Sequence, residues 1–433
     1  MSGKKANYSS VIDYMKDFLS SNNQKLMSCC YNAILDGNGD RYHRRQIPVL
    51  DDKEFDARFP LVASVILTAN KIECDSLNYM FSQQEGVSLY RRKRLLSIFL
   101  GSSFGSPEAY MIQWRSSFIL HLRASETGAN TPGGSTDLVR YVSRHQVLFP
   151  SSIISFGICY GRKPGIQNIG DVIIPKRLYP WSIGQKISEE GFKIKNDEFN
   201  LSLEERFASS GIYSSLREFC NGEDGRILKG SVSFPSRRNG SCSRSFSVKV
   251  TLGNMSTGEA VVSSVKAKKL IQESMGNEKE LGGEMEGYGL AKECIYYTQI
   301  PCLIVKAICD WGEAKNIDKV LEDARLPFPP HLKDKLQAYA AFCAGVVLTQ
   351  LLEQEKEVLL PLYLIQWMGD QTKSDAIGEC DYVDREVILK HIKSLYKVKL
   401  DDAQMIFDKL EQYQFIKQVA NGTRYHVNTD KGL

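Results

Sequence analysis

The sequence predicts an α/β protein. Short, nearly continuous apolar runs rich in β-branched residues alternate with helical patterns over about 300 residues. The runs are "LVASVILTA", "SSIISFGICYG", "DVIIPKRLY", "FSVKVTLG" and "PCLIVKAICD". Runs of this kind are typical of strands covered by helices on both faces. The segments "STDLVRYVSRH" and "HLKDKLQAYAAFCAGVVLTQLLEQ" place apolar residues at helical spacing, so they predict two of the covering helices.

A chain of 433 residues is long for one hydrophobic core, and we expect three units. These are an N-terminal helical extension over 1–57, the α/β domain over 58–357 and a small domain over 358–433. In the last unit, two amphipathic helical segments precede the turn signal Asn421-Gly422, an order typical of a winged-helix domain. Residues 359–433 hold ten Lys/Arg against eleven Asp/Glu, so we interpret this domain as a regulatory or protein-interaction module.

Composition limits the classes of protein to which the chain can belong. The apolar fraction of 42% and the charged fraction of 24% are ordinary for a soluble globular protein, and a net charge of +4 is no argument for nucleic acid as a partner. Eleven cysteines without paired CxxC spacing indicate reduced thiols, and no run reaches the ~18 apolar residues of a membrane span. We expect a cytoplasmic protein that contacts no membrane. The six histidines show no ligand spacing, so we expect no catalytic metal and no cofactor.

Acidic residues follow three of the predicted strands. Glu73 comes soon after the first run, Asp310 ends the last, and Glu284 and Glu286 stand in the glycine-rich stretch "GGEMEGYGLAKE". Each alone also fits a helix cap or a solvated strand end. Ligands of α/β sheets collect at the carboxyl ends of strands, so together these acids indicate a ligand site.

The order of "TAxxxE", "GICYG", "IGDVIIP", "STGEA", "EMEG" and "VKAICD" resembles the purine nucleoside phosphorylase superfamily. Its methylthioadenosine nucleosidase branch is the nearest likeness, over residues 61–352. The resemblance implies a three-layer α/β/α domain with a central mixed, barrel-like sheet. It also implies cleavage of the N-glycosidic bond of purine nucleosides.

The resemblance further implies roles for the acidic residues. Glu286 would accept hydrogen bonds from the ribose 2′ and 3′ hydroxyls, with Met285 against the sugar and Glu284 supporting the loop. Asp310 would donate a proton near N7 of the leaving purine. Glu73 would activate water, which favours hydrolysis over phosphorolysis.

Several positions depart from the family pattern. Lys306 stands where the family has arginine near the nucleophile, and Ile158, after Gly157 in the strand end "GICYG", replaces a small polar residue. Cys309 replaces a serine, and we interpret it as a buried small residue. An apolar slot for the base survives as Val261 and Val262.

Asn70 replaces the methionine that faces an apolar 5′ group, so we expect a polar 5′ end on the substrate. Guanidinium groups bind phosphate bidentately, which favours a phosphorylated substrate. The candidate cations are Arg162, Lys163, Arg237, Arg238 and Arg244. A surface of ordinary charge explains them equally well. The segment "TGANTPGGS" is similar to a phosphate-binding loop in composition only, because it lacks the GK[ST] ending.

We therefore expect a purine nucleosidase or nucleotide N-ribosyl hydrolase that acts on adenine nucleosides or nucleotides such as AMP and ATP. Phosphorylase-like domains fused to extra modules resemble effectors of bacterial antiviral defence systems. We therefore expect that this chain also acts as a defence effector. The alternatives are a phosphate-dependent phosphorylase and a non-catalytic nucleoside sensor. The expected partners are a small purine ligand, further copies of the chain in a homo-oligomer, and a protein that binds the C-terminal domain.

Overall fold

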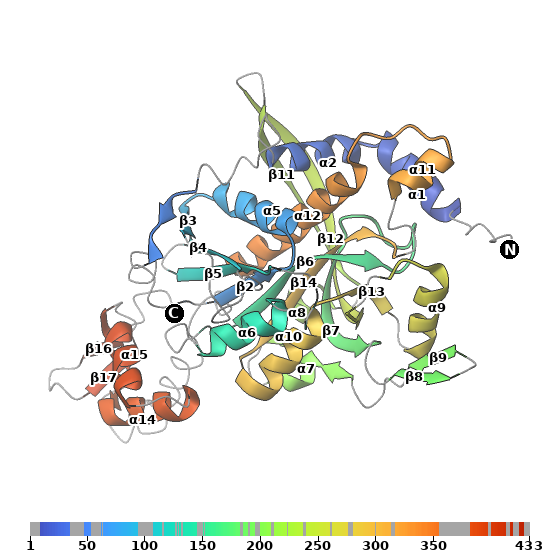
Figure 1. Ribbon diagram of the computed structural model, residues 1–433. Helices are drawn as coiled ribbons and strands as arrows, with labels where there is room; N and C mark the ends of the chain where they lie inside the picture. Colours follow the sequence, from blue (N-terminus) through green and yellow to red (C-terminus); the bar gives the residue numbers. More distant parts are fainter. Residues whose placement is uncertain are drawn as a thin grey trace.

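The structure is a computed structural model (Figure 1). It describes residues 9–34, 47–52, 62, 64–93, 107–114, 117–125, 128, 130, 133–144, 150, 152–181, 185–188, 191–194, 200–208, 212–222, 224–236, 240–259, 262–275, 280–298, 300–312, 317–354, 382–396, 400–412, 416–418 and 424–427.

Within these ranges, twelve strands form one mixed sheet. They are β1 (Val49–Leu50), β2 (Ser64–Thr68), β3 (Val87–Arg92), β4 (Glu108–Trp114), β5 (Ser117–Arg123), β6 (Ser152–Gly161), β7 (Val172–Pro180), β10 (Leu201–Ser202), β11 (Arg226–Ser236), β12 (Gly240–Thr257), β13 (Glu280–Glu284) and β14 (Cys302–Asp310). Five of them, β2, β6, β7, β12 and β14, lie on the five apolar runs of the sequence.

Part of this sheet closes on itself. β6 pairs with β13, β13 with β12, β12 with β7, and β7 with β14, which pairs in turn with β6. A ring of pairings is the defining feature of a barrel. β14 runs parallel to β6 and antiparallel to β7, and β13 runs antiparallel to β6. The mixed, barrel-like sheet expected from the sequence is confirmed.

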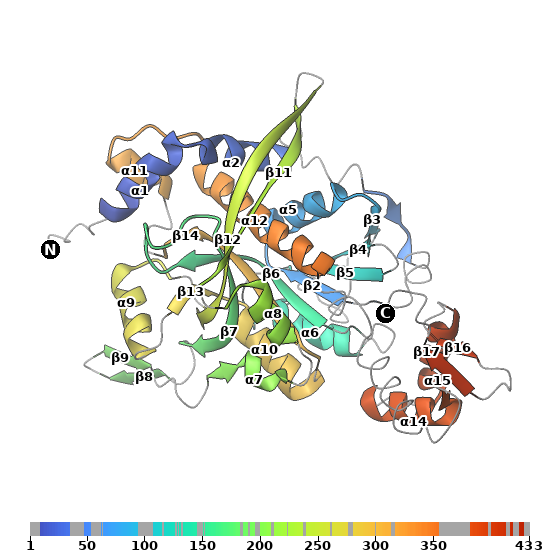
Figure 2. The same ribbon diagram turned by 180° about the vertical axis from the view of Figure 1, so that it is seen from behind.

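Helices cover both faces of the sheet (Figures 1 and 2). On one face, α12 packs against α2 and α5, and on the other α10 packs against α6. The helices of the main body are α1 (Ser9–Ser20), α2 (Asn22–Ala33), α5 (Lys71–Ser82), α6 (Ser135–Arg144), α7 (Leu203–Arg206), α8 (Ile212–Phe219), α9 (Val265–Ser274), α10 (Gly287–Glu293), α11 (Ile317–Asp323) and α12 (Leu332–Gln354); the π-helical turn η2 (Cys294–Thr298) continues α10.

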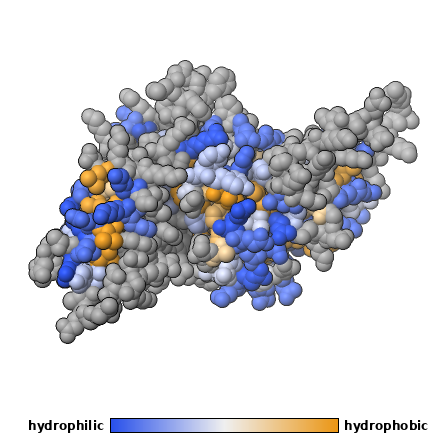
Figure 3. All heavy atoms as spheres, turned by 90° about the horizontal axis from the view of Figure 1, so that it is seen from below, coloured by the Kyte–Doolittle hydropathy of each residue, from blue (hydrophilic) through white to orange (hydrophobic). Residues whose placement is uncertain are grey.

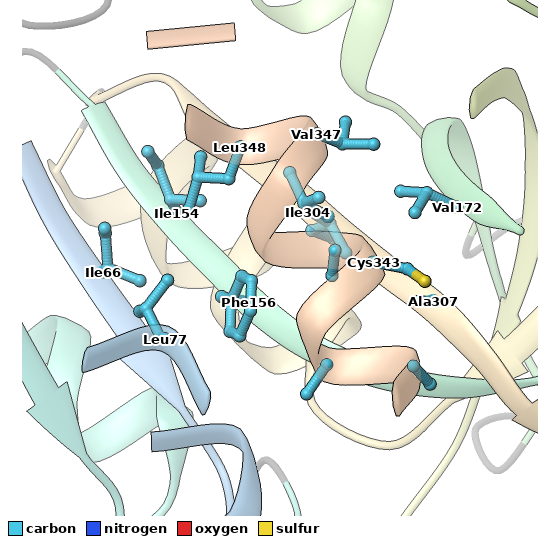
Figure 4. Close-up of a cluster of buried hydrophobic side chains, with 14 of the residues drawn as sticks. Ile66, Leu77, Ile154, Phe156, Val172, Ile304, Ala307, Cys343, Val347 and Leu348 are labelled. Atoms are coloured by element: carbon cyan, nitrogen blue, oxygen red, sulfur yellow. The ribbon is translucent and has the colours of Figure 1, made fainter. Parts of the chain in front are cut away.

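The long helix α12 forms the centre of the apolar core. Figure 4 shows Leu348 of α12 beside Ile154 of β6, with Val347 on the side of the helix that faces Val172 of β7, and all four side chains are buried. Leu332–Glu353 is long and apolar enough to cross a membrane, but 83% of its most apolar 18-residue window is buried inside the fold. Such burial is typical of a core helix, and no other helix in the described part of the chain passes the same test.

Two features extend this core. The N-terminal helices α1 and α2 place Met15 and Met27, both fully buried, in the same apolar cluster as α12. The antiparallel pair β11 and β12 runs past the barrel as a long hairpin, which projects from the top of the molecule in Figure 1. A separate two-stranded sheet joins β8 (Gln185–Ser188) and β9 (Gly191–Ile194).

The C-terminal part has its own small sheet. Its elements are β15 (Val383–Asp384), α14 (Arg385–Tyr396), α15 (Leu400–Gln412), β16 (Ile416–Gln418) and β17 (Arg424–Val427). The strand order in the described residues is β15-β17-β16, with β16 antiparallel to β17. Helices and hairpin thus follow in the expected order, while the predicted turn at Asn421-Gly422 lies outside the described residues. The winged-helix assignment and the domain boundaries remain predictions.

Figure 3 shows one face of the molecule, on which hydrophilic residues surround small hydrophobic groups. Among the described residues, the large apolar side chains that are exposed come from separate parts of the chain, except Tyr296 and Tyr297, which both belong to η2. They are Val49, Ile166, Ile227, Val265, Tyr296, Tyr297, Val387 and Leu400.

Candidate active site

Three glutamates and one lysine form a buried charged cluster, which we call the carboxylate–lysine cluster. It consists of Glu73 from the first turn of α5, Glu284 from the end of β13, Glu286 from the start of α10, and Lys306 from β14. The amine of Lys306 is 3.1 Å from Oε2 of Glu286 and 3.8 Å from Oε2 of Glu284. Lys306 is fully buried, and the exposed fractions of Glu73, Glu284 and Glu286 are 2%, 5% and 8%.

Glu73 is held by backbone N–H groups. Its Oε2 accepts from Ala69 at 2.8 Å and Asn70 at 3.1 Å, and its Oε1 accepts from Ile158 at 3.0 Å. In return, Asn70 Oδ1 accepts from the backbone N–H of Glu73, which completes a capping box on α5. This capping explains an asparagine at position 70 without any ligand. A carboxylate has about four acceptor positions, so Glu73 retains one for a further donor.

Gly157 makes this arrangement possible. A Cβ atom at position 157 would lie 2.2 Å from Oε1 of Glu73, closer than non-bonded atoms can approach. Only glycine allows β6 to pass this close to the carboxylate. The register of β6 and β14 places Gly157 opposite Lys306, so the same glycine lies between the base candidate and the lysine.

Glu286 is bound from two sides. Its Oε2 accepts from Lys306, and its Oε1 accepts from the backbone N–H of Gly128 at 3.3 Å. The hydroxyl of Ser135 donates to the backbone carbonyl of Glu286 at 3.1 Å. Gly128 and Ser135 belong to the "TGANTPGGS" segment, for which the sequence predicts no definite role. In the structure, this segment binds the side chain and the backbone of Glu286.

Glu284 closes the loop that carries Glu286. Its Oε2 accepts from the backbone N–H of Glu286 at 2.8 Å, and both of its oxygens accept from Gly287. These donors stand at the N-terminus of α10, where unpaired N–H groups favour a carboxylate. Glu284 therefore stabilises the turn between β13 and α10.

The charges of the cluster shift each other's protonation. Burial raises the pKa of Glu73 and of Glu284, and the positive charge of Lys306 opposes this only in part. Burial by itself lowers the pKa of Lys306, but Glu286, Glu73 and Glu284 together raise it above its usual value. Three carboxylates and one ammonium group would leave two negative charges if all were ionised. The cluster thus favours a protonated lysine and cations or hydroxyl donors as ligands, and it disfavours anions.

The topology explains how the cluster assembles. β2 is parallel to β6, and Thr68 at its end is in register with Phe156. β13 approaches from the opposite direction, because it is antiparallel to β6, with Gly282 in register with Gly161. The carboxyl ends of β2 and β13 therefore both reach the middle of β6 near Gly157. Glu284 stands at the carboxyl end of its strand, as the sequence predicts, although β13 runs antiparallel to β6.

Asp310 lies outside the cluster, four residues further along β14 than Lys306, which corresponds to about 13 Å of extended strand. Its Oδ1 accepts from the backbone N–H of Gly312 at 2.7 Å, and the thiol of Cys309 lies 3.6 Å from its Oδ2. Asp310 is half-buried and lines a pocket. The other lining residues are Val11, Met15, Ile169, Cys309, Trp311, Ile317, Lys333, Leu336 and Gln337.

The remaining expected site residues lie around these groups. Met285 and Ile158 are half-buried, Cys309 is buried, and Val262 packs with Tyr160 and Ile271. Val261 lies outside the described residues, as do Arg237 and Arg238.

The candidate phosphate-binding cations separate into two places. Arg162 and Lys163 are exposed directly after the end of β6. Arg244 is half-buried on the projecting hairpin, thirteen residues before Thr257, or roughly 40 Å of strand. The structure therefore does not bring Arg244 to the cluster.

A buried histidine supports the segment that carries Glu73. The ring of His121 on β5 is fully buried, with Nδ1 2.9 Å from Asn78 Oδ1 and Nε2 2.9 Å from the hydroxyl of Thr68. Because the amide oxygen only accepts, Nδ1 carries the proton and Nε2 accepts from Thr68. Burial lowers the pKa of His121 to about 3, so the ring is neutral. It joins the end of β2 to α5, the two elements on either side of Asn70.

Among the described side chains, no group of three or more His, Cys, Asp or Glu residues is arranged to hold a metal ion.

Residues that the sequence did not single out, among them Gly128, Ser135 and His121, form the surroundings of the cluster. For His121, the available signal in the sequence is a histidine inside an apolar run, and this signal indicates no role until the fold is known.

The fold is similar to several solved structures. Futalosine hydrolase of Helicobacter pylori has 14% sequence identity and a TM-score of 0.41, over 69% of this chain and 99% of its own. For the H. pylori 5′-methylthioadenosine/S-adenosylhomocysteine nucleosidase, the identity is 15% and the TM-score 0.40, over 67% of this chain and 97% of its own. The Neisseria meningitidis enzyme of the same name has 16% identity and a TM-score of 0.38, over 67% and 100%.

The two nucleosidases carry the name of the branch that the sequence motifs resemble. No protein-family model matches the sequence, and no curated protein matches it.

Proposed function

We propose that the chain is an N-ribosyl hydrolase that cleaves the base–ribose bond of purine nucleosides or nucleotides. The observation that carries the proposal is the carboxylate–lysine cluster, in which one carboxylate oxygen of Glu286 accepts from Gly128 and the other from Lys306. A buried group of this kind is costly to maintain. Such groups are found chiefly where a ligand or a reaction needs them.

Glu286 serves as the acceptor for the ribose diol. Of its roughly four acceptor positions, Gly128 and Lys306 occupy two, which leaves two for the 2′ and 3′ hydroxyls. Hydrogen bonds to a carboxylate contribute more than neutral ones. Glu286 is also the most exposed of the three glutamates, as a residue that meets a ligand must be.

Glu73 serves as the base that activates water. Its backbone donors fix the carboxylate and leave one acceptor position for a water molecule. In the reaction, the bond between the anomeric carbon and the base breaks, and its electron pair leaves with the purine. Water adds to the anomeric carbon and gives a proton to Glu73, while Asp310 gives a proton to the purine N7. Asp310 lines a pocket together with Cys309 and Trp311.

Water is favoured over phosphate as the nucleophile because of the charge around Lys306. Its amine faces Glu286 and Glu284, so carboxylates of the protein already balance its positive charge. A phosphate dianion would be repelled from this place, whereas water is neutral.

We propose adenine nucleotides such as AMP or ATP as substrates. Support comes from Arg162 and Lys163, which are exposed directly after β6, the strand that contacts Glu73. We further propose a role as a defence effector, assembly into a homo-oligomer and a protein partner for the C-terminal domain. The extra modules at both ends of the α/β domain are what supports these three points.

A non-catalytic purine sensor is the second candidate. The capping box of Asn70 and Glu73 favours it, because α5 would need this glutamate even in a protein without activity. Catalysis would then be absent while binding through Glu286 remained.

The test is release of free base from adenosine, AMP, ATP and methylthioadenosine, each with and without inorganic phosphate. We expect base release without phosphate, and its loss in Asp310→Asn while equilibrium binding of the substrate survives. Binding without base release by the wild-type protein would favour the sensor, and absence of both would overturn the proposal.

A further inference from the structure

The turn Asp310–Trp311–Gly312, which follows β14, is held by a buried lysine from another element. Lys268 of α9 is only 5% exposed, and its amine donates to the backbone carbonyl of Trp311 at 2.7 Å. An ammonium group loses much hydration free energy when it is buried, so a buried lysine needs strong acceptors. The carbonyl of the residue directly after Asp310 is one of them.

The same turn rests on an aromatic ring. Gly312 has a φ of +68°, and a Cβ atom there would lie 3.1 Å from Cγ of Tyr160. Both the backbone conformation and the close approach favour glycine. The backbone N–H of Gly312 donates to Asp310, so the position of the ring bears on the carboxyl group itself.

The ring of Tyr160 is fixed at its far end. Its hydroxyl lies 2.7 Å from Oγ of Ser256 and 3.1 Å from Oε1 of Glu280. Ser256 also donates to Glu280, whose side chain is 2% exposed. Burial raises the pKa of Glu280, and the positive charge of Lys268 opposes that rise.

We propose that Lys268 is a positioning residue for the acid Asp310, with Tyr160 as the floor of the same turn. A proton passes to the purine only if the carboxyl group points at the nitrogen, and a displacement of about 1 Å can cost about 10²-fold in rate. Lys268 fixes one end of the turn, Gly312 on Tyr160 fixes the other, and Asp310 is the acid between them. This inference rests on the proposed hydrolase function.

The test compares two leaving groups. A purine needs a proton to depart, whereas 4-nitrophenolate leaves from 4-nitrophenyl β-D-ribofuranoside without one. Lys268→Met keeps the length of the side chain and removes the ammonium group. We expect kcat on the purine nucleoside to fall about 10- to 100-fold, part of what a general acid contributes, with KM and the nitrophenyl rate within about 3-fold.

The neighbouring residue on α9 supplies the control. Lys269 has a 74% exposed side chain paired with Glu273, so Lys269→Met should leave both rates unchanged. Lys268→Arg keeps a donor and should recover most of the loss. In an Asp310→Asn background, Lys268→Met should have no further effect, because the two residues act on one step.

Equal losses on both substrates, or no loss on either, would overturn the positioning role. If Lys268→Met does not fold, Tyr160→Phe replaces it, because it keeps the ring and removes its anchor; we expect the same selective loss. A wild-type protein that cleaves the nitrophenyl riboside but releases no purine would contradict Asp310 as the acid. One that cleaves neither substrate would overturn the proposed hydrolase itself.

Discussion

The amine of Lys306 lies 3.1 Å from the carboxylate of Glu286, and neither group is more than slightly exposed to solvent. Glu284 and Glu73 add two further acids around the same amine. The positive charge of Lys306 thus stabilises three buried glutamates, whose carboxylates would otherwise lack a counter-charge. Removing it leaves buried carboxylates without a counter-charge.

Lys306→Met should therefore destabilise the fold. We expect the free energy of unfolding in urea at neutral pH to fall by about 3–5 kcal/mol, the usual cost of breaking a buried ion pair. The deficit should shrink as the pH is lowered, because protonation removes the repulsion between the carboxylates. Lys306→Arg retains the charge, and Lys269→Met is the surface control; both should be milder. A loss below about 1 kcal/mol, with no pH dependence, would mean that the cluster is not charged as described.

The pH profile of kcat/KM should report the base. Burial raises the pKa of Glu73, and a base acts only when deprotonated, so activity should rise with pH through a value above the ordinary glutamate range. Glu73→Gln should lower the rate about 10²- to 10⁴-fold and remove this acidic limb. An acidic limb that persists in Glu73→Gln would belong to another group, and Glu73 would then be only the cap of α5.

Stability at acidic pH should depend on His121. Its folded pKa of about 3 lies below the unfolded value near 6.5, so its contribution is complete above pH 6.5 and is lost as the pH falls through 6.5 toward 3. We expect this loss to be roughly 1 kcal/mol per pH unit, measured by urea unfolding between pH 7 and pH 4.5.

His121→Gln should abolish that part of the slope. His331 is exposed and has a positive φ, which asparagine tolerates, so His331→Asn is the matched control and should keep the slope. Equal slopes in the wild type and in His121→Gln would show that the ring is not buried in the neutral form.

The 5′ end of the substrate should be read by Arg162. A charge-assisted contact contributes roughly 1.5–3 kcal/mol, so Arg162→Ala should lower kcat/KM for AMP about 10- to 100-fold and change that for adenosine little. Added salt should also weaken AMP selectively. Steady-state kinetics on AMP, ATP, adenosine and methylthioadenosine at matched ionic strength measures this, with Lys269→Ala as the control. Equal losses on all four substrates, or a wide preference for methylthioadenosine, would contradict a charged 5′ pocket.

Much of the fold could be predicted because the pattern is local. Buried strands such as β6 and β14 require apolar runs, and α12 requires helical spacing, so each appears in the sequence. The antiparallel strands β3, β4 and β5 were not predicted, since their shorter patterns are ambiguous. The length of the hairpin formed by β11 and β12 could not be predicted either, because it depends on pairing between Ser and Gly positions with weak preferences.

The candidate site follows the same division. The acidic residues could be chosen from the sequence, because each stands at the end of a recognisable run. Their mutual arrangement could not be predicted. It depends on the antiparallel pairing of β13 with β6, and on the absence of a side chain at Gly157, which leaves room for the carboxylate of Glu73. Asn70 is a different case: its expected contact with the 5′ end of the substrate stays a prediction, while the structure shows that its side chain caps α5.

The central claim is that this chain transfers the ribose of a purine nucleoside or nucleotide to water. The most direct test is incubation of AMP and adenosine with the wild-type protein in H₂¹⁸O, with mass spectrometry of the sugar product, in phosphate-free buffer and with phosphate added. We predict free adenine and ribose or ribose 5-phosphate, with one ¹⁸O at the anomeric carbon at early times and no dependence on phosphate. Ribose 1-phosphate without ¹⁸O, or intact substrate after prolonged incubation, would contradict the account.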